Sequence, residues 1–488
     1  MWLVVTRPGL AEAVKPLAEF RSAEGYETKV STQPIEKALA EAGRAPATLL
    51  LVGDDQPGQQ TQDWYVPAKR VTHYRWRSNQ PREFASDMAW GDTHGDGVPE
   101  FPVGRIPART AKEVEQVVAK TLAFERRAAR EDDLRLPVWA GSAAYGGPAS
   151  DVLATHMLLG MIRVKTPDWA VPWIIASDAN HSLCGWPADQ PGQYARQIQR
   201  GGVLLCMIGH AGRTHFYGMT HQGRTIAFTA EHARTELAQG APAAPMVIIA
   251  CLAGDFTGPQ SCLAETLLAS PAGPVAIIAA TTESHPLPNF HSGTCCLQEL
   301  GGKEKRIGAL WLGAQRSMLK TRNFLVDGVL RDVEGDLGET IDADRLKADQ
   351  ILLYTLLGDP ATKLKLPATM EAAAARNGSG WSWKVDAPAG TTRVVAGYRP
   401  VNVELPAAGT ERKEDQARAA FEKANAAYAY APAVTSGQGA TWTGTSAKDG
   451  LVRLLATGPG VFHVAVLRLV TPATAPTENA GRTALPAR

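Results

Sequence analysis

Residues 203–218 read VLLCMIGHAGRTHFYG, a run apolar enough to form a buried strand that ends at His210. Residues 246–256, MVIIACLAGDF, form a second such run, which ends at Cys251 and is followed by a glycine-containing loop. Two parallel strands that stop in this way bring their last residues to the carboxyl edge of a sheet, where open α/β sheets place their ligand crevice. The two runs therefore predict a site in which an imidazole lies beside a thiol.

The pairing of a histidine with a cysteine has a defined chemical use. A thiol is a weak nucleophile until it loses its proton, and a nearby imidazole can take that proton. Backbone amides after each strand end can then hold the oxyanion of an acyl-transfer intermediate. One alternative is a packed core histidine and a buried cysteine. Another is a zinc site, since His215, His221 and His232 also lie nearby. However, His210, His215 and His221 lack helical spacing, and no CxxC or HExxH pattern accompanies them.

The bulk composition excludes several classes of protein. A chain of 488 residues is too long for one ordinary core and predicts more than one domain. Fifty basic and 49 acidic residues give a net charge of +1, so no global field points to nucleic acid or an acidic membrane as a partner. No run approaches the ~20 apolar residues that cross a bilayer, so we expect no membrane span. Six cysteines in a chain of this length do not make a disulfide scaffold.

The first two thirds of the chain alternate between strand and helix patterns. WLVVT near the N-terminus, ATLLLVGD from residue 47 and GPVAIIAATT from residue 273 are typical of short buried strands. Between them, Thr110 and Glu113 form a capping box at the start of an amphipathic helix. The alternation predicts an α/β fold with a parallel sheet that is covered on both faces by helices.

The amino-acid composition and the pattern of apolar residues change after Leu366. An alanine-rich stretch and RNGSG predict a linker. Residues 380–472 then contain several strand patterns separated by Gly/Pro turns, which predict a C-terminal β-sandwich-like module with a helical insert at residues 411–429. Its tryptophans, Trp381, Trp383 and Trp442, are expected to fill a small core, with a binding face as the alternative. Residues 473–488 predict a polar, flexible tail.

Several motifs together resemble those of the gingipain family of cysteine peptidases. They are IGHAG at residues 208–212, IIACLAGDF at 248–256, SCLAETLLAS at 261–270 and GPVAIIAATT at 273–282. The likeness extends to residues 86–125 and to YTLLGDPATKLKL at 354–366. It implies a caspase-like, three-layer α/β/α catalytic domain over residues 131–366, an N-terminal α/β subdomain over residues 1–130, and an immunoglobulin-like fold for the C-terminal module.

The resemblance also implies roles for single residues. Cys251 matches the nucleophile and His210 the general acid–base of a cysteine endopeptidase. The oxyanion would then lie against the backbone amides of Cys251, Ala211 and Gly212. Ala211 stands where the family usually has glycine, so its amide fits only if the local backbone suits a residue with a Cβ atom. Tyr145 stands where the best-known members have an acidic residue.

The specificity of the predicted peptidase is tied to two positions. Asp151 falls where the resemblance places the acid that selects a cationic side chain, which would favour cleavage after Arg or Lys. The alternative is that Asp151 caps a helix that begins there. His285 stands where the best-known members have a tryptophan that lines the primary specificity pocket.

A glycine-rich turn, GDTHGDGVPEF at residues 91–101, carries Asp92, Asp96 and Glu100. Carboxylate oxygens are the ligands that calcium prefers, although the spacing is not that of an EF-hand. The resemblance implies a structural calcium ion near this segment, with Asp96 and Glu100 as candidate ligands. The alternative is an acidic surface turn. No cofactor is expected for the catalytic step.

The sequence therefore predicts a cysteine endopeptidase acting on a protein or peptide substrate. Two alternatives stay open: an inactive, scaffold or binding protein with the same fold, suggested by Ala211 and Tyr145, and an intracellular processing peptidase with another specificity. Residues 1–10, MWLVVTRPGL, lack the basic flank and long apolar core of a signal peptide, so we expect none in this chain. The localisation therefore stays open: the sequence favours the cytoplasm, whereas the resemblance implies secretion if a leader was removed.

Overall fold

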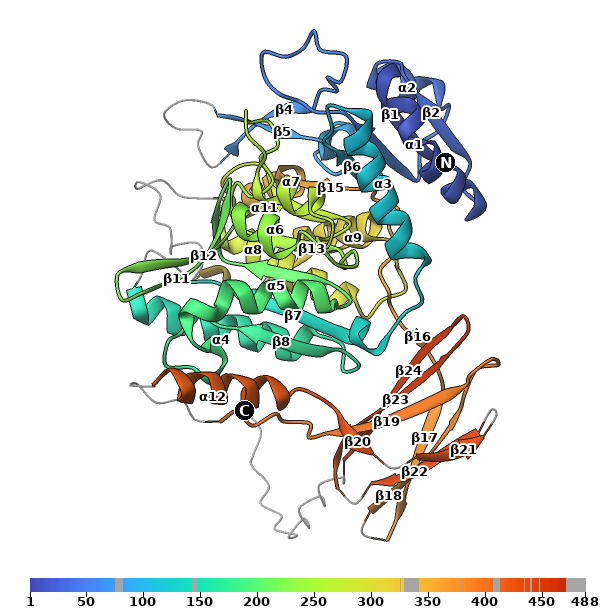
Figure 1. Ribbon diagram of the computed structural model, residues 1–488, viewed down its shortest axis with the longest axis vertical. Helices are drawn as coiled ribbons and strands as arrows, with labels where there is room; N and C mark the ends of the chain where they lie inside the picture. The colour runs from blue at the N-terminus through green and yellow to red at the C-terminus, as the bar shows by residue number, and fades with distance from the viewer. Residues whose placement is uncertain are drawn as a thin grey trace, which may run out of the picture. The chain divides into compact units, whose positions relative to one another are not determined.

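The computed structural model describes residues 1–74, 82–142, 147–324, 326–328, 342–378, 380–406, 413–433, 435–438, 441–446 and 448–470. Two compact units divide the chain (Figure 1). The first contains residues 1–367 and 404–429, and the second contains residues 368–403 and the chain from residue 430 onward.

Ten strands of the described residues form one sheet at the centre of the first unit (Figure 1). From edge to edge they are β2 (Thr28–Ser31), β1 (Trp2–Thr6), β3 (Thr48–Val52), β6 (Val103–Ile106), β15 (Tyr354–Leu357), β14 (Ile277–Ala280), β13 (Met246–Ile249), β9 (Leu205–Ile208), β7 (Arg135–Ala140) and β8 (Val171–Ile175). All neighbours are parallel except β14 and β15. The predicted parallel sheet therefore consists of two parallel halves that run in opposite directions and meet at β15.

Helices cover both faces of this sheet. One face packs against α1 (Pro8–Ala23), α3 (Ala111–Arg126), α5 (Gln190–Arg200), α6 (Ala230–Glu236) and α7 (Leu263–Ala269). The other packs against α2 (Ile35–Glu41), α4 (Gly147–Lys165), α8 (Pro286–Glu299), α9 (Ile307–Lys320) and α11 (Ala343–Leu353). The expected three-layer α/β/α arrangement is confirmed. In the described residues, no helix combines the length and apolar character that a bilayer crossing requires.

The residues of β9 show why this strand is apolar along its whole length. Leu205 and Met207 contribute to the core on one face of the sheet, whereas Cys206 and Ile208 contribute to the core on the other. A strand whose alternating side chains face two helical layers must be apolar throughout, which is why such strands read as continuous hydrophobic runs. The capping box of α3 also forms as expected, since the Thr110 side chain accepts from the Glu113 amide.

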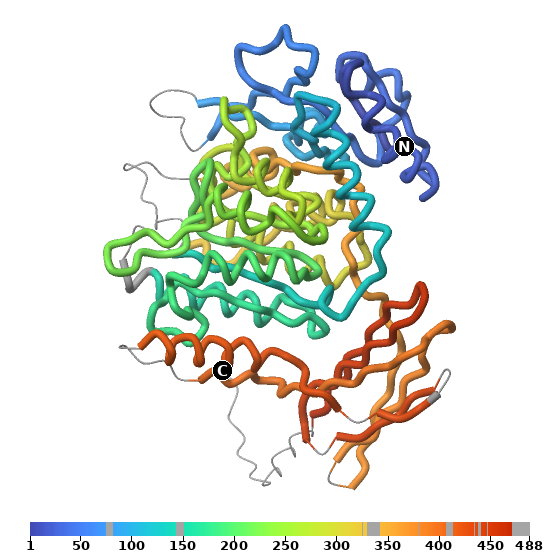
Figure 2. Tube along the Cα trace, viewed as in Figure 1, coloured from blue at the N-terminus to red at the C-terminus, as the bar shows by residue number. Residues whose placement is uncertain are grey.

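Smaller sheets lie beside the central one. β4 (Lys69–Thr72) and β5 (Glu83–Ser86) form a two-stranded antiparallel pair. β10 (His210–Gly212), β11 (His215–His221) and β12 (Arg224–Thr229) form a three-stranded antiparallel sheet, whose β11–β12 hairpin projects from the body of the unit (Figure 2). Short 3₁₀ turns also occur, as η2 (Met88–Trp90), η3 (Glu131–Leu134), η4 (Ser182–Cys184) and η5 (Pro187–Asp189).

The edge strand β8 is covered by α12 (Glu414–Ala426), which belongs to the first unit although the strands of the second unit flank it in sequence. The Asn425 side chain accepts from the Ile174 amide (2.7 Å) and donates to the Ile174 carbonyl (3.1 Å). Phe421 packs edge-on against Trp173, with ring centroids 5.4 Å apart. The carboxamide of Asn425 thus pairs with a strand edge that would otherwise be open to another chain.

The second unit contains two sheets. One has the order β16 (Ala368–Thr369), β24 (Val461–Leu469), β23 (Gly450–Gly458), β19 (Arg393–Arg399), β20 (Ala431–Ala433), and the other β17 (Ala372–Asn377), β18 (Gly380–Asp386), β22 (Thr441–Ser446), β21 (Thr435–Gln438). Both contribute to one core, which contains Trp383. The alanine-rich stretch expected as a linker is strand β17, because its backbone pairs along the whole of β18. The linker prediction was wrong.

Candidate active site

The register of β9 and β13 places His210 and Cys251 at equivalent positions. Ile208 pairs with Ile249 in parallel, and the amide of Gly209 donates to the Ile249 carbonyl at 3.0 Å. His210 and Cys251 each lie two residues past that pair, at the carboxyl ends of strands that neighbour each other roughly 4.8 Å apart. The structure therefore brings the predicted imidazole and thiol to the same edge of the sheet.

His210 and the two residues that follow it form strand β10. Ala211 pairs with Phe216 of β11, and Gly212 pairs with His215. Among the described residues other than glycine, only Gln222 and Leu252 have a positive φ, so Ala211 adopts a backbone conformation that suits alanine. Its departure from glycine therefore introduces no backbone strain. A Cβ atom at Gly212 would lie 2.7 Å from the His215 ring, so a larger residue there would require that ring to move.

The turn after Cys251 is sharply bent. Leu252 has a φ of 56°, a left-handed conformation that costs a residue with a side chain about 1–2 kcal/mol. The turn is held from the neighbouring strand end, since the Leu252 amide donates to Thr282 O at 3.1 Å and the Gly254 amide to Ala280 O at 2.9 Å. Such strain persists where surrounding contacts enforce it, often at functional sites. These contacts fix the backbone that carries the thiol.

The thiol of Cys251 differs from the other five. Cys251 is half-buried, whereas the remaining cysteines are all buried. Burial raises the pKa of Cys206 to about 12, and it holds the pKa of Cys262 and of Cys296 well above the usual value. Thiols that stay protonated are poor nucleophiles. Cys251 is the one cysteine that is not fully buried. Cys262 is a packed residue that caps α7.

Arg213 links the chain after His210 to the turn after Cys251. Its Nε donates to Asp255 Oδ2 (3.0 Å) and to the Asp255 carbonyl (3.1 Å), and its Nη2 donates to the same carbonyl (2.8 Å) and to Gln260 O (2.6 Å). Oδ1 of Asp255 accepts from the amide and hydroxyl of Thr257. Asp255 therefore holds its own loop to Arg213 by hydrogen bonds.

Asp151 lies inside α4, not at its beginning. The helix begins at Gly147, so Asp151 is not the N-cap residue and the capping alternative was wrong. Its Oδ1 accepts from the hydroxyl of Ser142 at 2.6 Å. Ser142 follows Ala140 of β7, which pairs with Ile208, so this bond also lies at the carboxyl edge of the sheet. Tyr145 lies outside the described residues.

His285 caps α8. Its Nδ1 accepts from the Leu287 amide at 3.2 Å, and only 2% of the residue is exposed. The ring is therefore buried at the N-terminus of α8. Its role in lining a specificity pocket stays a prediction.

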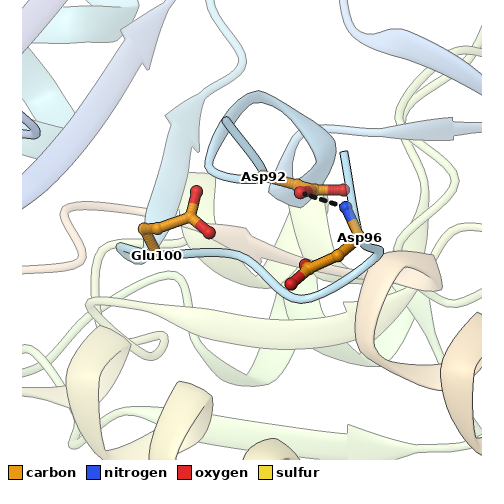
Figure 3. A group of neighbouring side chains, drawn as sticks. All are labelled: Asp92, Asp96 and Glu100. Carbon is orange, nitrogen blue, oxygen red and sulfur yellow. Dashed lines mark hydrogen bonds between the residues drawn. The ribbon is translucent and has the colours of Figure 1, made fainter. Parts of the chain in front are cut away.

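The acidic turn after η2 gathers three carboxylates, those of Asp92, Asp96 and Glu100, whose oxygens lie within 4.8 Å of one another (Figure 3). Oδ1 of Asp92 accepts from the Asp96 amide (3.1 Å), as Figure 3 shows. Burial acts to raise the pKa of Glu100, but hydrogen bonds from Thr93 and His94 outweigh it and lower the pKa to about 2. Glu100 is thus an ionised oxygen donor at neutral pH. Carboxylate oxygens are the ligands that calcium prefers, so this group of residues fits a calcium ion.

Two residues of the site were missed in the sequence. Ser284 lies against Cys251 Sγ, and Arg213 joins the two strand-end segments. Ser284 had a usable signal, because it follows the buried run of β14 as Cys251 follows that of β13. Arg213 had none, since its bonds to Asp255 and Gln260 cross more than forty positions of sequence.

A half-buried thiol at the carboxyl edge of an α/β/α sheet, with a histidine at the equivalent place on the next strand, is the arrangement of a cysteine-type hydrolase. Residues 1–365 match the model of peptidase family C25, and the chain belongs to that family. It is thus a cysteine-type peptidase of the gingipain family, as its motifs predicted.

Solved structures agree with this assignment at the level of the fold. The complex of Porphyromonas gingivalis RgpB pro- and mature domains matches with a TM-score of 0.52 and 16% identity, over 96% of this chain and 99% of that one. The Arg-specific cysteine proteinase gingipain R (RgpB) matches with a TM-score of 0.52 and 16% identity, over 96% and 97%. A structure described as a protease matches with a TM-score of 0.56 and 14% identity, over 96% of each chain. A comparison with curated proteins finds no match.

Proposed function

We propose that the protein is a cysteine endopeptidase in which Cys251 is the nucleophile and His210 the general acid–base. The observation that carries this proposal is the parallel pairing of Ile208 with Ile249, because it brings the two residues to equivalent strand ends. The partial exposure of Cys251, against the burial of the other cysteines, points to the same residue.

The proposed mechanism passes through a thioester. His210 takes the thiol proton, and the Cys251 sulfur forms a bond to the carbonyl carbon of the scissile peptide. The amides of Cys251, Ala211 and Gly212 are the candidate donors to the oxyanion. The C–N bond then breaks as His210 returns the proton to the leaving amine. Water, activated by His210, attacks the thioester and regenerates the thiol.

We further assign a preference for Arg or Lys before the scissile bond. The support is Asp151, a carboxylate that bonds to Ser142 beside the end of β7, next to the strand that leads to His210. A carboxylate there would pair with a cationic side chain of the substrate. His285 would support the wall of the same pocket from beneath, consistent with its burial.

We also assign a structural calcium ion to Asp92, Asp96 and Glu100. The support is the spacing of their oxygens and the low pKa of Glu100, which keeps its charge at neutral pH. The ion would brace the turn that precedes β6, and the proposed chemistry needs no metal.

A caspase-like fold for the first unit and an immunoglobulin-like fold for the second complete the proposal. The first rests on the helix-covered sheet with the candidate dyad on neighbouring strand ends. The second rests on two sheets that share one core.

Hydrolysis of a fluorogenic peptide panel by the full chain tests this function. The panel varies the residue before the scissile bond, and the wild type is compared with Cys251→Ala and His210→Ala. Turnover by the wild type and its loss in both variants is the expected result. Turnover that survives in Cys251→Ala would overturn the assignment of the nucleophile, and a preference for apolar residues would overturn the role of Asp151. A well-folded wild type that cleaves no member would favour the scaffold alternative.

A further inference from the structure

Ser284 contacts the Cys251 sulfur through two different atoms. Cys251 Sγ lies 3.6 Å from the Ser284 backbone carbonyl and 3.8 Å from the Ser284 hydroxyl. Ser284 follows β14, the neighbour of β13, and only 2% of it is exposed. The thiol therefore faces a hydrogen-bond acceptor and a potential donor that belong to one residue.

A buried polar network stands behind the Ser284 hydroxyl. Asn289 of α8 donates from Nδ2 to Ser284 Oγ at 2.7 Å. The Asn289 Oδ1 in turn accepts from the Tyr354 hydroxyl (2.8 Å) and from Gln350 Nε2 (2.8 Å). Tyr354 and Gln350 are both fully buried. Burial raises the pKa of Tyr354, so its hydroxyl keeps its proton and remains a donor.

The hydrogen bonds of this network all donate in one direction, toward Ser284. Tyr354 and Gln350 both donate to Oδ1 of Asn289, which fixes the carboxamide with its Nδ2 toward Ser284. An oxygen that accepts from Asn289 can direct its own hydrogen toward the sulfur. A neutral thiol can donate to the Ser284 carbonyl, whereas a thiolate cannot and instead needs a donor. Hydrogen bonds to an ionised group are the stronger kind.

We propose that Ser284 is a positioning residue that holds the Cys251 sulfur in both of its protonation states. Its carbonyl accepts from the thiol, its hydroxyl donates to the thiolate, and Asn289 keeps that hydroxyl oriented. The inference rests on the proposed role of Cys251 as the nucleophile, to which it adds a partner on a third strand end. Ser284 acts through Cys251 and takes no part in bond making or breaking.

Other titratable groups lie on the segments that carry Cys251 and Ser284. His210 stands at the neighbouring strand end, Tyr354 lies behind the network, and Glu283 and His285 flank Ser284 in the chain. Glu283 pairs with Arg82 at 3.3 Å. Ser284 also hydrogen-bonds Tyr354, and Ser284→Thr keeps the hydroxyl that makes this bond. A change in the ionisation of Cys251 that appears in Ser284→Ala and is restored in Ser284→Thr therefore reports the serine hydroxyl.

The experiment measures the rate of iodoacetamide alkylation of Cys251 against pH, with the modified peptide quantified by mass spectrometry. It compares the full-length wild type with Ser284→Ala, Ser284→Thr and Ser292→Ala. Ser292 is the matched control, because its buried hydroxyl accepts from the same Gln350 (3.2 Å) and donates to Gln315 (3.1 Å). Ser284→Thr keeps a hydroxyl at the site.

Ser284→Ala should move the midpoint of the alkylation profile upward by about one pH unit, the scale of one lost hydrogen bond to a charged group. Ser284→Thr should restore most of that shift, and Ser292→Ala should match the wild type. Superimposable profiles for Ser284→Ala and wild type would overturn the inference, as would an equal shift in Ser292→Ala. The peptidase test separates the two proposals: activity in Cys251→Ala refutes the nucleophile, while an inactive Cys251→Ala with an unshifted Ser284→Ala refutes only the role of Ser284.

Discussion

Arg213 donates hydrogen bonds to both the carboxylate and the backbone carbonyl of Asp255, at 3.0 Å and 2.8 Å for the shortest bond to each. Arg213 follows His210 by three residues and Asp255 follows Cys251 by four. One guanidinium therefore ties together the two segments that carry the candidate dyad. A planar fork with several donors can hold such a geometry, whereas a lysine ammonium cannot reproduce it.

Substitution of Arg213 by lysine should slow catalysis more than it weakens substrate binding. The charge stays but the fork is lost, and a displacement of about 1 Å between reacting groups can reduce the rate about 100-fold. We expect kcat to fall about 10- to 100-fold with a small change in KM, measured by steady-state peptide hydrolysis. Arg234→Lys is the matched control, because Arg234 forms an exposed pair with Glu231 on α6.

Gly258→Ala should lower kcat in the same way while leaving Arg213 itself in the sequence. A Cβ atom at Gly258 would lie 2.2 Å from Arg213 Nη2, so the guanidinium must move. Wild-type kcat in both Arg213→Lys and Gly258→Ala would show that the Arg213–Asp255 link does not position the dyad.

Glu265→Gln should stabilise the protein at high pH and not at low pH. Burial is the main cause that raises the pKa of Glu265 from 4.5 to about 7, and nearby Asp54 adds to it. Between these values the folded state binds more protons than the unfolded state, so stability falls as pH rises through this range. Above pH 7 this shift lowers the free energy of unfolding of the wild type by on the order of 3 kcal/mol. Glutamine preserves the acceptor for the Cys262 amide. Chemical unfolding should show a gain at pH 8 and little change at pH 4.5; equal effects at both would contradict this account.

Calcium should raise the unfolding temperature of the wild type. A ligand at 100 times its Kd stabilises by about 2.7 kcal/mol, which we expect to appear as a shift of a few degrees, about 2–5 °C. Asp96→Asn keeps the acceptor for the Val98 amide but removes a charge, so it should lose this response. Differential scanning calorimetry of both proteins, without added metal and with CaCl₂ or MgCl₂, measures the unfolding temperature. Identical unfolding with and without calcium would identify an acidic surface turn.

Asn425→Leu should destabilise the first unit through the edge strand. It would leave the amide and carbonyl of Ile174 without their side-chain partner, at a cost of about 1–3 kcal/mol for each buried group. Urea unfolding should report a loss of about 2–4 kcal/mol, and light scattering should report self-association of the exposed edge. Glu422→Leu, at an exposed position of the same helix, should change stability by less than about 0.5 kcal/mol. Equal stability of the two variants would show that Asn425 does not protect the edge.

Local sequence patterns predicted much of the central sheet because its strands are buried on both faces. WLVVT is β1, and the runs that end at His210 and Cys251 contain β9 and β13. The register of two such strands also follows from where each apolar run stops, which is why the candidate dyad was visible before the structure.

The remaining features depend on contacts between distant residues. The antiparallel junction at β15 gives no periodic signal, since the strand is apolar whichever way it runs. The alanines of β17 favour helix or linker by propensity, yet pairing with β18 makes them a strand. Ala211 could not be judged without its φ, and the Asn289 amide that orients Ser284 is placed by the packing of α8.

Covalent labelling tests the central claim most directly. Two peptidyl acyloxymethyl ketones, one with arginine and one with leucine next to the reactive group, are incubated with the full chain, and the adduct is located by mass spectrometry. We predict one adduct per chain, on Cys251, with the arginine reagent preferred, no adduct in Cys251→Ala, and labelling slowed about 100-fold or more in His210→Ala. An adduct on another residue, or a well-folded wild type that takes up neither reagent, would contradict the assignment of Cys251 and His210.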